Sequence, residues 1–123
     1  MIPGSGKAKE FLSMPYYANF IKDLLNVDIY PGTLNLRTEE EFHPPESKCV
    51  GTLEKNENRG GIKIYGPYRL VKCNQTSLQV YPAWYIKPSK TFHPTNVSEW
   101  ICKHHIRKEL DLNDNDMVFI FDY

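Results

Sequence analysis

Apolar side chains recur at helical spacing near the start of the chain. Between residues 13 and 25 they stand at positions i, i+3, i+4, i+7 and i+8, on one face of an α-helix: Tyr17, Phe20, Ile21, Leu24 and Leu25. Ser13 can cap the first turn, and Pro15 is tolerated there because first-turn amides have no intrahelical partner. The pattern therefore predicts an amphipathic helix over Ser13–Leu25.

Short apolar runs, separated by turn-forming residues, occupy most of the remaining chain. The turn formers include Asn56–Gly61, Gly66-Pro67 and Pro82. A second short helix is predicted near Lys103–Leu110. Short strands at this spacing favour a mainly β domain with two short helices, built as a small closed or half-closed barrel. The expected strands are Thr33–Arg37, Cys49–Lys55, Ile62–Tyr65, Tyr68–Cys73, Leu78–Tyr81, Trp84–Lys87 and Met117–Phe121.

Composition and charge narrow the class of protein. The chain has 123 residues, enough for one domain with its own core, so residues 1–123 are expected to form a single domain. Its 15 basic and 15 acidic side chains cancel, which argues against a nucleic-acid partner. No apolar run approaches the roughly 20 residues that span a bilayer, and the amino terminus lacks the apolar stretch of a signal peptide. We expect a cytoplasmic protein.

The cysteines do not suggest a metal or disulfide framework. Cys49, Cys73 and Cys102 are odd in number and far apart, and none belongs to a C-x-x-C pair. They are interpreted as reduced thiols, and a zinc site is not expected.

The turn Pro31-Gly32 and the residues after it are the first candidate for chemistry. Thr33 and Asn35 alternate along a strand, so their side chains face the same side. A hydroxyl and an amide oxygen are poor magnesium ligands by themselves, because hard cations prefer carboxylates and water, but they suffice when phosphate oxygens supply the charge. The plainer interpretation is a hairpin turn followed by two polar strand residues.

Three further segments carry polar or basic residues. Gly4-Ser5-Gly6-Lys7-Ala8-Lys9 combines glycines, which permit an anion-binding nest, with two lysines, although taken alone it is better explained as a flexible terminus. Pro88–His93, followed by Glu99, could face a polar ligand or be an ordinary surface loop. Lys103–Lys108 is a basic start to a helix and could simply be a solvated face. None of these segments identifies a function alone.

Read together and in order, the segments resemble the archaeal CTP-dependent riboflavin kinase family over nearly the whole chain. The string Tyr30–Leu36 is close to the family's most recognisable motif, and Pro88–His93 resembles its Pro-x-Arg/Lys-Thr-aromatic-His turn. Glu99 follows Thr91 at the family's spacing of eight residues, and Ile106–Val118 resembles its Leu-Arg…Leu…Asp-Gly-Asp-x-Val ending.

The resemblance implies a six-stranded cradle-loop (RIFT-type) barrel that transfers the γ-phosphoryl group of CTP to riboflavin, giving FMN and CDP. It further implies that Mg²⁺ is held by Thr33 and Asn35, together with phosphate oxygens, and that the flavin is bound by Thr91 and Glu99. We add the hypothesis that Glu99 orients or deprotonates the attacking hydroxyl. A monomer is expected, with riboflavin/FMN and CTP/CDP as its partners and neither nucleic acid nor membrane. The nucleotide contacts implied are Gly4, Ser5, Gly6, Lys7, Ala8, Lys9, His104, His105, Ile106 and Arg107.

Two departures keep other functions open. Where the family's glycine loop continues Gly-x-Gly-Glu-Gly, this chain has Lys7 and Ala8 in place of the acid and the last glycine. A module that binds a nucleotide or flavin without turnover is therefore one alternative. A structural or partner-binding domain of a larger assembly is the other, since a fold alone does not define a function.

Overall fold

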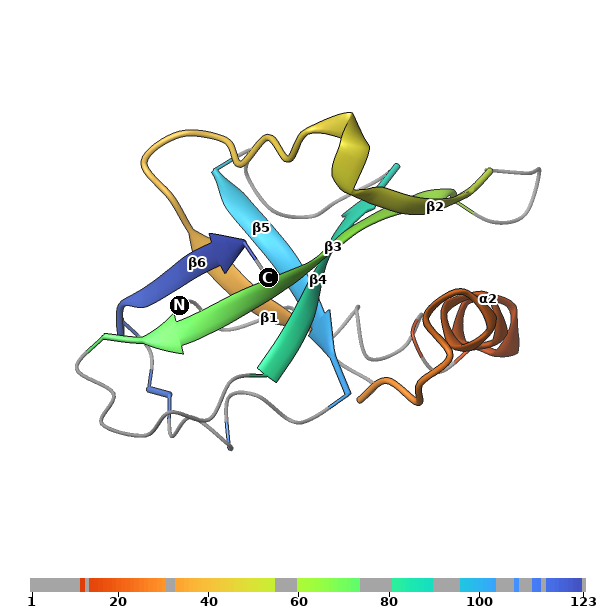
Figure 1. The fold of residues 1–123 in the computed structure, drawn as a ribbon, viewed down its shortest axis with the longest axis horizontal. Helices are drawn as coiled ribbons and strands as arrows, with labels where there is room; N and C mark the ends of the chain where they lie inside the picture. The colour runs from red at the N-terminus through yellow and green to blue at the C-terminus, as the bar shows by residue number, and fades with distance from the viewer. Residues whose placement is uncertain are drawn as a thin grey trace.

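The computed structural model describes residues 12, 14–30, 33–54, 60–73, 81–89, 96–103, 108, 112–113 and 115–122. This part of the chain forms one α-helix, one 3-10 turn and six strands (Figure 1). In chain order they are α2 (Pro15–Leu25), β1 (Leu34–Arg37), the 3-10 turn η1 (Glu46–Lys48), β2 (Cys49–Leu53), β3 (Ile62–Lys72), β4 (Tyr81–Pro88), β5 (Val97–Cys102) and β6 (Val118–Asp122).

All the strand pairs are antiparallel, and β3 pairs with three other strands, β2, β4 and β6. The order is β1-β5-β4-β3-β2, with β6 also paired to β3. Strand β2 pairs with the first part of β3, up to Tyr65, and β6 pairs with the last part, from Tyr68 to Lys72. Figure 1 shows β2 and β6 at opposite ends of the long β3 ribbon. The predicted mainly β architecture is confirmed, whereas closure of the sheet into a barrel stays a prediction.

Two predicted strand breaks are wrong, because β3 and β4 run through proline positions. Gly66-Pro67 is not a turn between two strands: β3 continues through it with a register shift against β4 between Tyr65 and Tyr68. Such an irregularity bends a strand and lets it change partners, here from β2 to β6. Pro82 lies within β4, near its start, where the missing amide hydrogen is tolerated.

Strand β5 is not predicted by the sequence pattern. Its burial is high on both faces, so it lacks the regular apolar–polar alternation of a half-exposed strand.

The predicted early helix is confirmed, but it begins at Pro15 with Met14 as its N-cap, and Met14 makes no side-chain capping bond. Most of the second helix predicted near Lys103–Leu110 lies outside the described residues.

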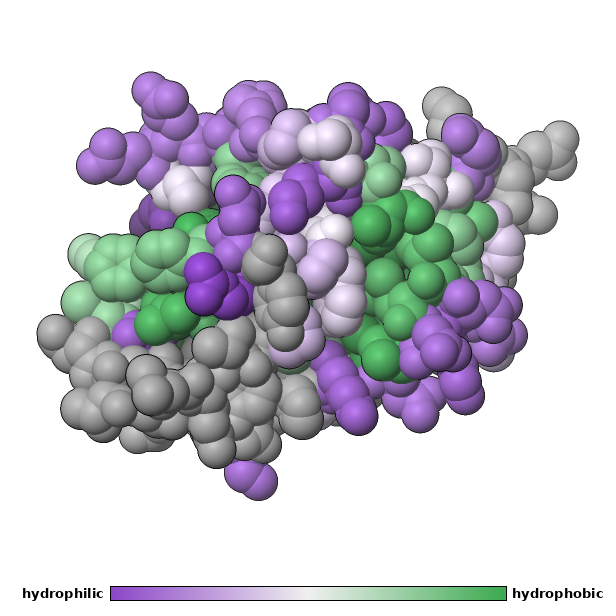
Figure 2. Space-filling view, in the orientation of Figure 1, coloured by the Kyte–Doolittle hydropathy of each residue, from purple (hydrophilic) through white to green (hydrophobic). Residues whose placement is uncertain are grey.

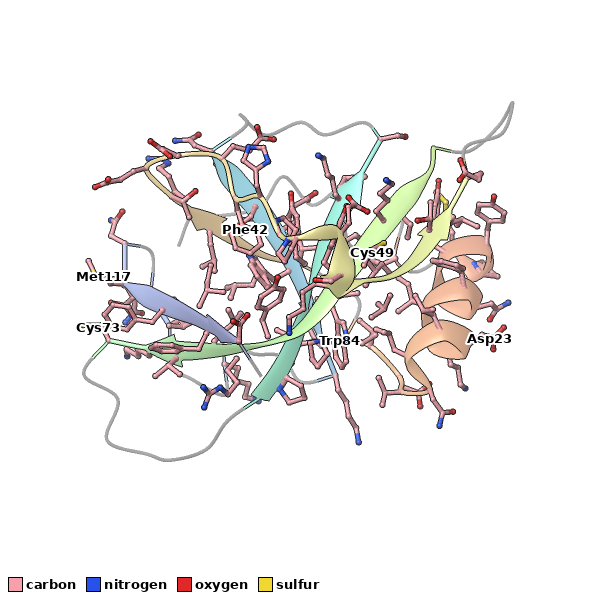
Figure 3. All side chains as sticks on the ribbon, turned by 45° about the horizontal axis from the view of Figure 1, so that its top comes forward. Asp23, Phe42, Cys49, Cys73, Trp84 and Met117 are labelled. Carbon is pink, nitrogen blue, oxygen red and sulfur yellow. The ribbon has the colours of Figure 1, made fainter. Side chains whose placement is uncertain are left out.

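One face of the sheet carries an aromatic core. Tyr65, Tyr68, Tyr85 and Trp100 pack there with ring centroids 5.5–5.7 Å apart. Phe42, labelled in Figure 3, reaches into this cluster from the loop after β1, 5.1 Å from Tyr85 and 5.3 Å from Trp100. Burial, followed by nearby negative charge on Glu41 and Glu99, raises the pKa of Tyr85 to about 12. Its hydroxyl is therefore neutral at physiological pH.

Helix α2 covers part of the other face. Ile21 packs among Ile62, Ile64, Ile86 and Ile101. The helix can approach β2 closely because a Cβ atom at Gly51 would lie 2.5 Å from a methyl carbon of Leu24. Asp23 points away from the sheet (Figure 3).

The surface at β6 is apolar. Met117, just before β6, and Phe119 and Phe121, on β6, are exposed. Figure 2 shows an apolar area at the left, where β6 lies in Figure 1. The three cysteines form no disulfide. Among the described residues, no helix has the length and apolar character that a membrane span requires.

Gly66 offers a test of the irregularity in β3. Its φ of 147° favours glycine, and a Cβ atom there would lie 2.8 Å from Cδ1 of Trp84 and 3.1 Å from the Ala83 carbonyl oxygen. We expect Gly66→Ala to lower the free energy of unfolding by about 1–3 kcal/mol in urea denaturation. Val50→Ala, at an exposed position of β2, is the control. Equal stability of the two variants would contradict the prediction.

Candidate functional site

Strands β1 and β5 bring two of the predicted site residues face to face. The register pairs Leu34 with Trp100, Asn35 with Glu99 and Leu36 with Ser98. Leu34 and Leu36 point into the aromatic core, so Asn35 and Glu99 share the opposite face. Asn35 is only 2% exposed, and Glu99 is half-buried. A buried amide and a carboxylate from distant parts of the chain therefore stand side by side.

Thr33 joins this pair from the segment just before β1. Its hydroxyl donates a hydrogen bond to Oδ1 of Asn35 over 3.2 Å. Neighbouring ligands of an octahedral Mg²⁺ with bonds of about 2.1 Å lie about 3.0 Å apart. The 3.2 Å separation is that of the hydrogen bond itself, and it is close to this spacing. Among the described residues, no group of three or more His, Cys, Asp or Glu side chains could hold a metal ion.

A hydrogen-bond chain on the core side of the sheet holds the β1–β5 register. The indole Nε1–H of Trp100 donates to Oγ of Ser98 over 2.8 Å, and the Ser98 hydroxyl donates to the Leu36 carbonyl oxygen over 3.3 Å. These residues flank Asn35 and Glu99 directly. Trp100 is 1% exposed and Ser98 is 3% exposed, so the bonds are shielded from water. Their loss would leave a buried donor unpaired.

Backbone bonds secure both ends of the same strand pair. The Tyr30 amide donates to the Cys102 carbonyl oxygen over 2.9 Å. At the other end, the Thr38 amide donates to the Asn96 carbonyl oxygen over 2.9 Å. The segment that carries Thr33 and Asn35 is therefore fixed against β5 on both sides.

The start of the predicted flavin loop is also anchored. The Gly61 amide donates to Oγ of Ser89 over 3.0 Å, and the Ser89 amide donates to the Gly61 carbonyl oxygen over 2.9 Å. This reciprocal pair ties the end of β4 to the start of β3. Thr91, the predicted flavin contact, lies outside the described residues, as do the predicted nucleotide contacts Gly4–Lys9 and His104–Arg107.

The sequence alone does not identify the hydrogen bonds that hold the candidate site in place. Ser98 and Ser89 bond to Leu36 and Gly61, which are far away in sequence, so only the strand pairing reveals these partners. Trp100 bonds to Ser98, two residues away on the same strand. The alternation of Ser98, Trp100 and Cys102 is the one local signal that these residues share a buried face.

Comparison with known proteins finds similar sequences over nearly the whole chain. The family model CTP-dep_RFKase, described as "Domain of unknown function DUF120", matches residues 1–121. A riboflavin kinase of Methanobrevibacter smithii is 35% identical over 123 residues, covering 95% of this chain and 91% of the relative. A riboflavin kinase of Saccharolobus solfataricus is 32% identical over 129 residues, covering 98% and 69%.

A riboflavin kinase of Methanocella arvoryzae is 35% identical over 121 residues. That match covers 96% of this chain, which spans about half (52%) of the relative's length. The matched class of protein is a kinase, a transferase that acts on riboflavin. The chain belongs to the CTP-dependent riboflavin kinase family.

Proposed function

We propose that this protein transfers the γ-phosphoryl group of CTP to riboflavin, giving FMN and CDP. The observation that carries the proposal is the in-register pair of Asn35 and Glu99, with the Thr33 hydroxyl 3.2 Å from the Asn35 amide oxygen. Family membership supplies the substrates. Phosphoryl transfer depends on positioning and charge neutralisation, which neutral oxygen ligands beside a carboxylate can provide.

In this proposal Thr33 and Asn35 hold the phosphate end of the site, and Glu99 receives the acceptor alcohol. Directly opposed residues of an antiparallel pair have Cα atoms about 4.5–5.5 Å apart, so the two functions adjoin. The terminal ribityl hydroxyl oxygen forms the new bond to the γ-phosphorus, and the bond to the β–γ bridging oxygen breaks. Glu99 takes the hydroxyl proton, and CDP leaves.

Magnesium fits the donor set only together with the nucleotide. Thr33 and Asn35 provide two neutral oxygens, so phosphate oxygens and water would supply the remaining ligands. When bound there, Mg²⁺ would neutralise charge on the transferred group. We propose Gly4–Lys9 and His104–Arg107 as nucleotide contacts and Thr91 as a flavin contact, on the family resemblance alone.

A direct assay tests the reaction. The protein is incubated with riboflavin and Mg²⁺ together with CTP, ATP or GTP, and FMN is separated from riboflavin by chromatography. We expect FMN with CTP and little or none with ATP or GTP. Saturable CDP or riboflavin binding without any FMN would instead support the binding module suggested by Lys7 and Ala8.

If Glu99 acts as the base, its substitution should lower turnover without weakening nucleotide binding. We expect Glu99→Gln, which keeps the shape but removes the base, to lower kcat by about 100-fold or more. Its affinity for CDP should stay within about twofold of the wild type, measured by calorimetry. Glu40→Gln, at an exposed position before Phe42, should change neither quantity. Normal turnover in Glu99→Gln would exclude the proposed role.

The metal site predicts that magnesium affinity depends on nucleotide. We expect Mg²⁺ to bind the free protein weakly and to bind at least tenfold more tightly with saturating CDP, in a calorimetric titration corrected for Mg–CDP binding. Thr33→Val keeps the side-chain shape without the hydroxyl, and it should raise the Mg²⁺ concentration needed for half-maximal turnover. Tight Mg²⁺ binding without nucleotide would contradict the assignment.

A further inference from the structure

A hollow of about 460 Å³ opens where β2 ends, β3 begins and β4 ends. Figure 1 shows the end of β2 and the start of β3 projecting together from the rest of the sheet. Thr52, Lys63 and Lys87 line the hollow from three adjacent strands, with Tyr65 deeper in its wall. Its volume lies in the range of small-molecule sites.

The hollow lies on the opposite face of the sheet from the Asn35–Glu99 pair. Lys63 pairs with Thr52 of β2 on one side and with Lys87 of β4 on the other, so the three side chains form one row. Their neighbours Ile62, Ile64 and Ile86 belong to the face that α2 covers, and Glu99 pairs with Ile86. The row therefore belongs to a second, separate surface.

Two lysines directly opposite each other repel unless an anion lies between them. Lys63 and Lys87 are both exposed, and neither forms an ion pair with a carboxylate of the described part of the chain. Two acidic residues, Glu46 and Glu54, also line the hollow. Glu46 already accepts a hydrogen bond from the Tyr65 hydroxyl over 3.2 Å. Among the described residues, therefore, no carboxylate lies within ion-pair distance of either lysine, although Glu46 and Glu54 line the same hollow.

We propose that this hollow binds a small phosphomonoester, with the phosphate group between Lys63 and Lys87. Ammonium groups are suited to phosphate as point charges, and the Thr52 hydroxyl adds a donor in the same row. The carboxylates of Glu46 and Glu54 accept hydrogen bonds, which suits a ligand that also carries hydroxyl groups. The hollow is larger than a phosphate ion needs, which favours a phosphorylated polyol or nucleoside over phosphate alone.

Binding is tested with the whole chain, independently of any kinase activity. Ribose 5-phosphate, inorganic phosphate and CDP are each titrated while backbone amide shifts are followed by NMR. We expect saturable shifts at Thr52, Lys63 and Lys87 with ribose 5-phosphate, and weaker binding at the same residues with inorganic phosphate. Lys63→Gln and Lys87→Gln should each weaken ribose 5-phosphate binding by about tenfold. The proposal fails if CDP alone shifts these amides, or if all shifts stay near Thr33 and Asn35.

Lys22→Gln is the matched control, because Lys22 is an exposed lysine that pairs with Asp28 on the far side of α2. It should leave ribose 5-phosphate affinity unchanged, and an equal loss in this variant would overturn the proposal in favour of non-specific attraction to surface charge.

Thermal unfolding gives a second measurement. Without anion, Lys63→Gln should unfold at a higher temperature than the wild type, because repulsion is removed. Ribose 5-phosphate should raise the wild-type midpoint more than the variant's, and the reverse order would contradict the site.

Discussion

Four residues of β1 pair in register with four of β5, and this short ladder sets the position of every described residue of the candidate site. A slip of one residue would turn Asn35 toward the aromatic core and Leu34 or Leu36 toward the site. The Trp100–Ser98–Leu36 hydrogen-bond chain opposes that slip from the core side. A buried donor and acceptor without partners would make the wrong register costly.

One face of the sheet carries the aromatic core, and the other carries α2 and the candidate pair Asn35 and Glu99. The aromatic face, with Phe42 inserted from its loop, holds the β1–β5–β4 strands together. The other face carries α2 over β2, β3 and β4, while Asn35 and Glu99 occupy β1 and β5. Because Asn35 and Glu99 stand on strands that also carry the aromatic core, their relative position is set by the fold.

The proposed magnesium ligands differ from the rest of the scaffold in their charge. Thr33 and Asn35 are neutral, and the described residues offer no carboxylate cluster to complete a metal cage. A cation can be held there only when a phosphate group supplies charge, so metal and nucleotide are coupled in the proposed site. The family comparison shows membership of the CTP-dependent riboflavin kinase family, through matches that extend over nearly the whole chain.

The sequence by itself determined the local features: the amphipathic helix, the mainly β class and the shared side of Thr33 and Asn35, because each depends on spacing within a few residues. Order and spacing of the motifs also identified the family. Tertiary structure alone decided that β3 runs through Gly66-Pro67, that β5 is a strand, and that Glu99 faces Asn35. Those outcomes depend on pairing energies between different segments of the chain, as far apart as Asn35 and Glu99. Such energies leave no local pattern in the sequence.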